Sequence, residues 1–235
     1  MQGLNLRLGP LQYGKETKMS KKVSVFFDGY NFYYGAVKGT PYKWLDPVLL
    51  VKSMLREDNE IVSFRYFTAP VKTYPHDTAA IDRQKGYLQA LSTNPLIKIV
   101  QGFYSKNTTW LPVYEESCKT CKEPKDGMIR VVKLEEKRSD VNIATAMLMD
   151  VFQDKADVFV LVSGDTDFIG PVNIVRKDFN KTVIVLNPHN RKSWLCDYAS
   201  YYKDIPRELL AKCQFPDTIP YGKNRTLTRP AAWRE

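Results

Sequence analysis

The segment that most limits the possible folds of this chain is DVFVLVSGDTDF, residues 157–168. Its apolar stretch, residues 158–162, is continuous and rich in valine, which is typical of a strand buried on both faces of a parallel sheet. Two acids, Asp165 and Asp167, follow a serine and a glycine at the point where this strand would end. Ligands bind at that carboxyl edge in open α/β sheets. The segment therefore predicts a layered α/β protein with acids at its ligand-binding edge.

Two acids this close together favour a bound cation or proton, because their mutual repulsion is otherwise unrelieved. A second interpretation is that one acid caps a helix that begins near Ile169, while the other is solvated. The segment alone leaves both interpretations open.

The same arrangement recurs near the start of the chain. Residues 23–27 (VSVFF) predict a first strand, which ends on Asp28 and is followed by Gly29 and a helical turn. If both strands are central and parallel, Asp28 lies at the same edge as the later pair of acids, within reach of one ion.

Strands and helices alternate along the chain, which is typical of a layered α/β sheet. The further strands are predicted at residues 61–68, 97–104 and 182–186, and the helices at residues 46–55, 78–91, 140–152 and 169–179. A last αα or αβ segment, residues 193–213, is expected to complete the sheet.

The helix at residues 140–152 adds a fourth acid. Asp140 lies one turn before inward-facing apolar residues, so we expect its carboxylate on the inner side of the first turn. It could instead simply cap the helix. Lys137 and Arg138 just before it bring positive charge to the same rim and are candidate substrate contacts, although such side chains are mostly solvated.

Residues 105–127 read as an irregular insertion, and residues 128–134 as an edge strand. The insertion holds Cys118 and Cys121, spaced as half of a tetrahedral zinc site. A second such pair is missing from the sequence, so a structural zinc is only weakly supported. The remaining candidate zinc ligands are Cys196, Cys213, His76 and His189.

Composition narrows the class of protein further. The formal charge is +9 and the calculated pI is about 9.2, which favours a polyanionic partner such as nucleic acid, or else a merely basic surface. Four cysteines are too few for a disulfide framework. Since apolar runs near the ~20 residues of a membrane helix and a signal-peptide pattern are both missing, we expect a cytoplasmic protein without membrane contact.

The two ends of the chain differ from its middle. Residues 1–18 are expected to be a flexible extension, residues 19–213 one domain, and residues 214–235 a basic tail that is disordered or wraps a partner.

Four acids from separate stretches provide oxygen ligands, which suit Mg²⁺ or Mn²⁺. Two such ions can hydrolyse a phosphodiester without a histidine base. The two histidines, His76 and His189, follow prolines in ordinary loop contexts and are not predicted to be catalytic.

Three motifs resemble the NYN branch of the PIN-like nucleases, specifically its LabA-like group: VSVFFDGYNFY, EEKRSDVNIA and LVSGDTDF. The resemblance covers about residues 22–190. It implies a three-layer α/β/α sandwich with a mostly parallel central sheet, and a Mg²⁺- or Mn²⁺-dependent ribonuclease. The residues that match the acidic site of the family are Asp28, Asp140, Asp165 and Asp167, and those that match its supporting polar positions are Asn31 and Ser163.

Rival functions remain open. A haloacid-dehalogenase-type phosphatase needs an acid where this chain has Tyr30, so it is disfavoured. The others are a nucleotide- or RNA-binding module that needs a partner to cut, and a nuclease directed at DNA. The sequence favours a ribonuclease that acts on single-stranded RNA, and leaves open whether it forms an oligomer or needs a partner protein.

Overall fold

The computed structural model describes residues 20–71, 79–112 and 127–234. Its centre is a six-stranded parallel sheet with the order β3-β2-β1-β6-β7-β8. The strands are β1 (Lys21–Asp28), β2 (Asn59–Thr68), β3 (Ile97–Gln101), β6 (Val158–Val162), β7 (Thr182–Asn187) and β8 (Tyr201–Asp204). The predicted segment at residues 193–213 does complete the sheet, through β8.

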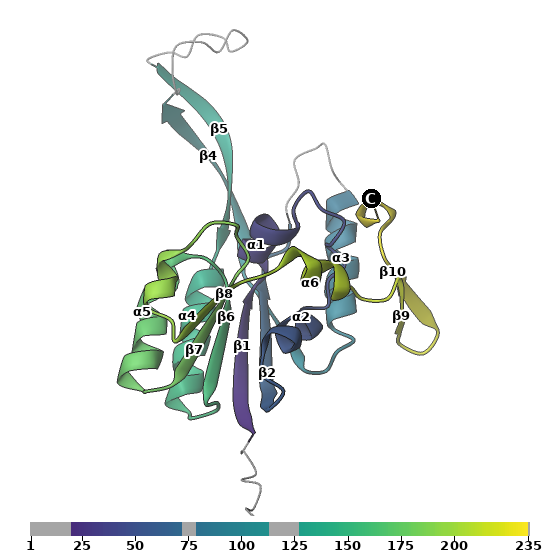
Figure 1. Ribbon diagram of the computed structural model, residues 1–235. Helices are drawn as coiled ribbons and strands as arrows, with labels where there is room; N and C mark the ends of the chain where they lie inside the picture. The colour runs from purple at the N-terminus through teal and green to yellow at the C-terminus, as the bar shows by residue number, and fades with distance from the viewer. Residues whose placement is uncertain (1–19, 72–78, 113–126, 235) are drawn as a thin grey trace, which may run out of the picture.

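Helices cover both faces of this sheet (Figure 1). α4 (Ser139–Phe152) and α5 (Ile169–Asn173) lie on one face, and α2 (Pro47–Met54) and α3 (Ala79–Leu91) lie on the other. Along β1, Phe26 joins the core beneath α4, whereas Val25 and Phe27 join the core beneath α2 and α3. The predicted three-layer α/β/α sandwich is confirmed.

The central strands explain why the apolar runs in the sequence are continuous. Every residue of β6 is buried, because its alternate side chains enter the two separate cores. β1 lies beside β6, although the two are far apart in the sequence. The chain runs outward from β1 through β2 to β3, and outward from β6 through β7 to β8, so the connections after β1 and β6 diverge. Such a switch point opens a crevice at the carboxyl ends of the two strands.

A long two-stranded arm projects from the body of the domain (Figure 1). It is formed by β4 (Phe103–Pro112) and β5 (Met128–Lys137), which pair antiparallel in a sheet of their own. The prediction of an irregular insertion from residue 105 is therefore wrong for residues 105–112, and residues 128–134 do not form an edge strand of the central sheet. Much of the arm is exposed on both faces, so its sequence lacks the alternating hydrophobicity of a half-buried strand.

The C-terminal segment is also folded, contrary to the expectation of a weakly structured tail. β9 (Thr218–Tyr221) and β10 (Arg225–Thr228) form a hairpin, and a 3-10 turn follows at Ala231–Trp233. The ring of Trp233 packs 6.2 Å from that of Trp44, whose indole Nε1 donates to the carbonyl oxygen of Pro216 at 2.8 Å. Apolar anchors among the basic residues therefore hold this segment against the domain.

The shorter helices complete the described part of the chain. α1 (Gly29–Phe32) continues into a π-helical turn at Tyr33–Val37, and α5 continues into another at Ile174–Asp178. 3-10 turns span Thr166–Phe168 and Trp194–Asp197, and α6 spans Arg207–Lys212. Within the described ranges, the helices are too short and too polar to cross a bilayer.

Candidate metal centre at the carboxyl edge of the sheet

Asp28 ends β1 and caps α1. It is only 3% exposed, and its Oδ1 accepts a hydrogen bond from the backbone N–H of Asn31 at 3.0 Å. Its Oδ2 accepts one from Ser163 Oγ at 3.1 Å. Gly29 permits the sharp exit from the strand, because a Cβ there would lie 2.7 Å from the carbonyl oxygen of Phe67. Asp28 is thereby tied to the residue that follows β6, the neighbouring strand.

The surroundings of Asp28 disfavour its negative charge. Burial raises the pKa of this carboxyl to about 7, although the hydrogen bonds from Asn31 and Ser163 oppose the shift. The negative charges of Asp140 and Asp165 raise the pKa further. A cation placed among these acids would favour ionisation of Asp28.

Asp165 and Asp167 follow β6, as predicted. Asp165 caps the 3-10 turn, since the backbone N–H of Asp167 donates to its Oδ1 at 3.1 Å. Ser163 Oγ, which donates to Asp28, also accepts from the backbone N–H of Asp165 at 3.1 Å. Helix capping and membership of an acidic group are therefore both true of Asp165. One serine connects the two strand ends.

Asp140 approaches from the first turn of α4. One carboxylate oxygen each from Asp140, Asp165 and Asp167 lies within 4.8 Å of the other two. Partial burial, and then the charges of Asp165, Glu136 and Asp167, raise the pKa of Asp140. Ion pairs between these three acids and a lysine or arginine are absent within the described ranges. Asp28 is outside this group of three but close enough to interact with it electrostatically.

These residues fit a divalent cation. The three carboxylates are hard oxygen donors, which Mg²⁺ and Mn²⁺ prefer, and they are close enough to share one ion. Asp140 and Asp167 are exposed and Asp165 is partly buried, so all three are accessible to an ion from solvent. We name Asp140, Asp165 and Asp167 the acidic triad.

Asn31 and His189 lie next to the acids, at the carboxyl edge of the sheet. Asn31 Oδ1 accepts from the backbone N–H of Gly164 at 2.9 Å and lies 3.1 Å from His189 Nε2. Gly164 has to be small, because a Cβ there would lie 2.6 Å from Asn187 Oδ1. Burial and the charge of Arg191 lower the pKa of His189, whereas Asp165 opposes that shift.

Sequence reasoning passed over two residues at this site. His189 was set aside as an ordinary loop residue, yet it follows β7 and so lies at the same edge of the sheet. Its place after a strand was the available signal. Glu136 accepts a hydrogen bond from Ser139 Oγ at 2.5 Å and raises the pKa of Asp140.

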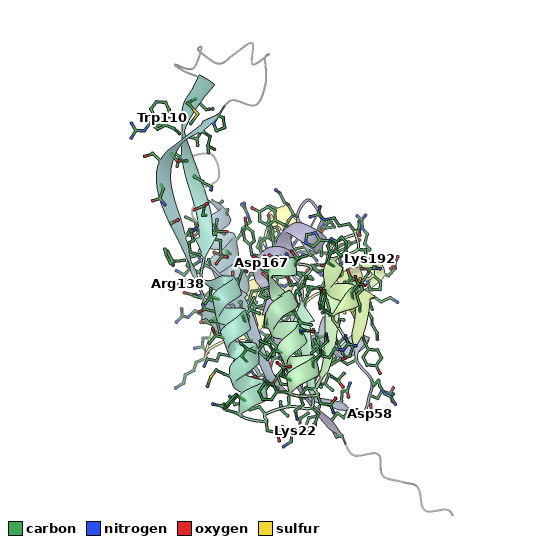
Figure 2. All side chains as sticks on the ribbon, turned by 90° about the vertical axis from the view of Figure 1, so that its left-hand side faces the viewer. Lys22, Asp58, Trp110, Arg138, Asp167 and Lys192 are labelled. Carbon is green, nitrogen blue, oxygen red and sulfur yellow. The ribbon has the colours of Figure 1, made fainter. Side chains whose placement is uncertain are left out.

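The two predicted substrate cations lie at the base of the arm. Lys137 Nζ is 3.0 Å from Glu135 Oε2, and the guanidinium of Arg138 lies 4.5 Å from the ring centroid of Phe103. Figure 2 shows Arg138 near the end of the domain that carries Asp167, away from Lys22 and Asp58. Both cations therefore have partners on the arm, and Arg138 lies near the end of the domain that carries Asp167.

The structure does not test the zinc prediction for Cys118 and Cys121. Cys118 and Cys121 lie outside the described residues. Cys213 is buried with its Sγ 3.8 Å from Ser53 Oγ, and Cys196 Sγ donates to Asp197 Oδ1 at 3.2 Å. In the part of the chain that the structure describes, only the acidic triad gathers three such ligand atoms.

Fold and site together define a layered α/β protein with a carboxylate centre at its switch point. Residues 22–206 match the NYN domain family, so the chain belongs to this family of the PIN-like nuclease superfamily. It is 30% identical over 241 residues to the 6-hydroxy-3-succinoylpyridine 3-monooxygenase HspA of Pseudomonas putida. The match covers 90% of this chain and 75% of that protein. A solved structure of a protein of unknown function from Vibrio parahaemolyticus matches 81% of this chain and 96% of its own, with a TM-score of 0.47 and 17% identity.

Proposed function

We propose that this protein is a divalent-cation-dependent ribonuclease that hydrolyses the phosphodiester bonds of single-stranded RNA. The observation that carries the proposal is the acidic triad, whose carboxylate oxygens approach within 4.8 Å without a basic partner among the described residues. Membership of a nuclease family supplies the reaction class.

Each group of residues has a separate role in the proposed reaction. The acidic triad would hold Mg²⁺ or Mn²⁺, with Asp28 beside it. When bound, such an ion neutralises phosphate charge and lowers the pKa of a water molecule. Asp28, whose pKa is about 7, can hold a proton on its carboxylate at neutral pH and release it when positive charge arrives. Ser163 keeps Asp28 and Asp165 in register through its two hydrogen bonds.

RNA as the partner is supported by the family and by the formal charge of +9. Lys137 and Arg138 are proposed to contact its phosphates, and Asn31 to hold the loop after β6 in place. The preference for RNA over DNA, a cytoplasmic location, and an oligomer or partner protein remain predictions from the sequence.

A cleavage assay tests the proposal. Fluorescently labelled single-stranded RNA and DNA of one sequence are incubated with Mn²⁺, Mg²⁺ or EDTA. Wild type is compared with Asp165→Asn and with the control Asp178→Asn, which alters an exposed acid beyond the site. We expect RNA cleavage that needs the metal ion, persists in Asp178→Asn and is lost in Asp165→Asn. RNA binding without cleavage under any metal would instead favour the binding module.

A second candidate is an oxygenase of small aromatic rings. It is favoured by one observation, the 30% identity to a protein named as a monooxygenase of a hydroxypyridine. That reaction consumes dioxygen and two electrons from a reductant. Oxygen consumption that depends on 6-hydroxy-3-succinoylpyridine, with reduced nicotinamide and flavin supplied, would support it. Oxygen consumption that is the same with and without the pyridine would remove this candidate.

A further inference from the structure

A cavity of about 850 Å³ lies directly beside Asp28. Gly29 and Tyr30, the two residues after Asp28, form part of its wall, and Trp233 near the C-terminus forms another part. Volumes of about 300–1,000 Å³ are typical of sites for small molecules. The remaining walls come mainly from the π-helical turn after α1, from β2 and from α3. Because Trp233 is part of the wall, the C-terminal segment contributes to a cavity at the carboxyl edge.

The walls of this cavity are aromatic. The rings of Tyr30 and Tyr34 lie 4.7 Å apart, and the ring of Tyr104 lies 6.4 Å from that of Tyr30. On another part of the wall, the ring of Tyr87 lies 6.1 Å from that of Trp233. Flat aromatic surfaces at several angles suit a planar aromatic ligand, because such rings stack or meet edge to face.

Three tyrosines of the lining are partly exposed. Tyr30, Tyr33 and Tyr34 are 41%, 39% and 48% exposed, while Phe32 between them is buried and anchors the helix. The exposed part of each ring is therefore accessible to a base, on which it can stack.

The charge of the lining is positive. Lys43 and Arg83 line the cavity, and aspartate and glutamate are absent from its described lining. Burial, and then the charge of Arg83, lower the pKa of Lys43, so the two cations lie close enough to repel each other. Lys43 Nζ donates to the carbonyl oxygen of Thr40 at 2.7 Å, and its ammonium group has further donors for a phosphate at the cavity surface.

The cavity also communicates with the acids of the crevice. The charge of Asp28 contributes to the raised pKa of Tyr66, a buried residue of the cavity wall. The negative charge of Glu136, which helps to raise the pKa of Asp140, also helps to raise the pKa values of Tyr30 and Tyr104. A ligand in the cavity would therefore lie next to the acids rather than in a separate part of the molecule.

We propose that this cavity is a subsite for one nucleotide of the RNA strand, with the base against Tyr30 and Tyr34 and a phosphate facing Lys43 and Arg83. The proposal rests on the proposed ribonuclease function and adds to it the part of the substrate that is gripped. A base in this position is unstacked from its neighbours, which requires a single strand. A small aromatic acid shares the same chemistry of ring and anion, and the test distinguishes it from a nucleotide.

The test is isothermal titration calorimetry in EDTA, so that no cleavage occurs. Adenosine monophosphate is titrated into wild type beside adenosine, ribose 5-phosphate and benzoate. We expect one molecule of the nucleotide to bind, and the three partial ligands to bind at least tenfold more weakly. Lys43→Met should weaken nucleotide binding roughly tenfold, since it removes a charged donor. Tyr30→Ala should weaken it at least fivefold through lost stacking.

Two controls separate this inference from the cleavage chemistry. Lys85→Met alters an exposed cation of α3 outside the cavity lining and should leave nucleotide binding unchanged. Asp165→Asn should bind the nucleotide at least as tightly as wild type does, because it removes a negative charge from the same edge of the sheet, even where it fails to cut RNA. Binding without any RNA cleavage would remove the ribonuclease function and leave the nucleotide site standing.

Three results would overturn the inference. The first is that the nucleotide does not bind to a protein that does cleave RNA. The second is binding that is unaffected by both Lys43→Met and Tyr30→Ala. The third is benzoate binding as tightly as the nucleotide, which would assign the cavity to a free aromatic acid.

Discussion

The acids at the two ends of helix α4 have opposite electrostatic environments. Asp150, near the C-terminal end, is completely buried, and its Oδ1 accepts hydrogen bonds from Arg65 at 2.8 Å and Lys155 at 3.1 Å. Burial opposes the charge of Asp150, but these bonds and the two positive charges outweigh it and lower the pKa. Asp140, in the first turn, has other acids as its charged neighbours, and its pKa is raised.

On this one helix, the acid that stabilises the fold and the acid of the candidate site therefore differ in their charged neighbours. Where an acid holds the fold together, the chain supplies the compensating cations, because a buried unpaired charge is strongly destabilising. Around Asp28 and the acidic triad, the described part of the chain supplies hydrogen bonds but no cation. Under the proposed function, a bound divalent cation supplies this positive charge. Four predictions test this contrast, beginning with the largest effect.

Asp150→Ala should destabilise the protein most. It leaves Arg65, whose side chain is only 16% exposed, without its carboxylate partner. Removing one partner of a buried ion pair costs about 3–5 kcal/mol. Urea unfolding followed by circular dichroism measures the change. The control Asp154→Asn breaks an ion pair whose acid is 79% exposed and should destabilise the protein far less. Equal losses in both variants would contradict the structural role of Asp150.

Asp28 should make stability fall as the pH rises. In the unfolded chain it ionises near 3.8, and in the fold near pH 7, so between these values the folded state binds more protons. Its contribution is complete below the unfolded pKa and is lost as the pH rises through the folded one. About 4 kcal/mol is the upper limit for this shift.

The measurement for Asp28 is urea unfolding in EDTA from pH 4 to pH 8, in wild type and in the isosteric variant Asp28→Asn. The difference between the two should change steadily across that range and favour the variant at high pH. A difference that does not vary with pH would show that Asp28 titrates normally in the fold. Asp150, with its lowered pKa, should behave oppositely, since its contribution is lost as the pH falls.

Asp140→Asn should separate activity from stability. It removes one of three candidate cation ligands and also relieves repulsion within the acidic triad. We expect RNA cleavage to fall at least about 100-fold, since even residues behind a metal ligand change activity by 10–100-fold. The free energy of unfolding should stay unchanged or rise. A stability loss like that of Asp150→Ala would make Asp140 a structural residue.

His189→Leu should have the smallest effect. It removes the contact with Asn31, whose side chain holds the backbone of Gly164 beside Asp165. A loss of cleavage of about tenfold is expected from this indirect positioning role. His189→Gln keeps a donor for Asn31 and should retain more activity than His189→Leu. Equal activity in the two variants would mean that the contact does not position the site.

Much of the fold was predictable from the sequence, because buried central strands and amphipathic helices leave strong periodic signals. The apolar run Val158–Val162 and the acids after it are enough to predict the carboxyl edge of the sheet. The arm was missed because its strands have exposed faces and so lack that signal. The C-terminal segment was missed because charge dominates its composition, whereas Trp233 and its ring contacts decide its structure.

The candidate site was predictable in part for the same reason. Asp28 ends one strand, and Asp165 and Asp167 come shortly after its neighbour, so the topology brings all three to one edge. His189 also follows a strand, but a proline and an asparagine around it suggested an ordinary loop. Its contact with Asn31 depends on how close β7 and α1 lie in space, which local sequence does not report. The cavity beside Asp28 joins residues from Gly29 to Trp233, and residue spacing gives no sign of it.

The most direct test of the unpaired acids is Mn²⁺ binding, followed by electron paramagnetic resonance at neutral pH. Wild type is titrated beside Asp165→Asn and Asp178→Asn. The account predicts that wild type and Asp178→Asn bind Mn²⁺ with the same affinity, and that Asp165→Asn binds it at least about tenfold more weakly. Equal affinity in all three proteins would contradict it, because the acids at the carboxyl edge would then not form the cation site.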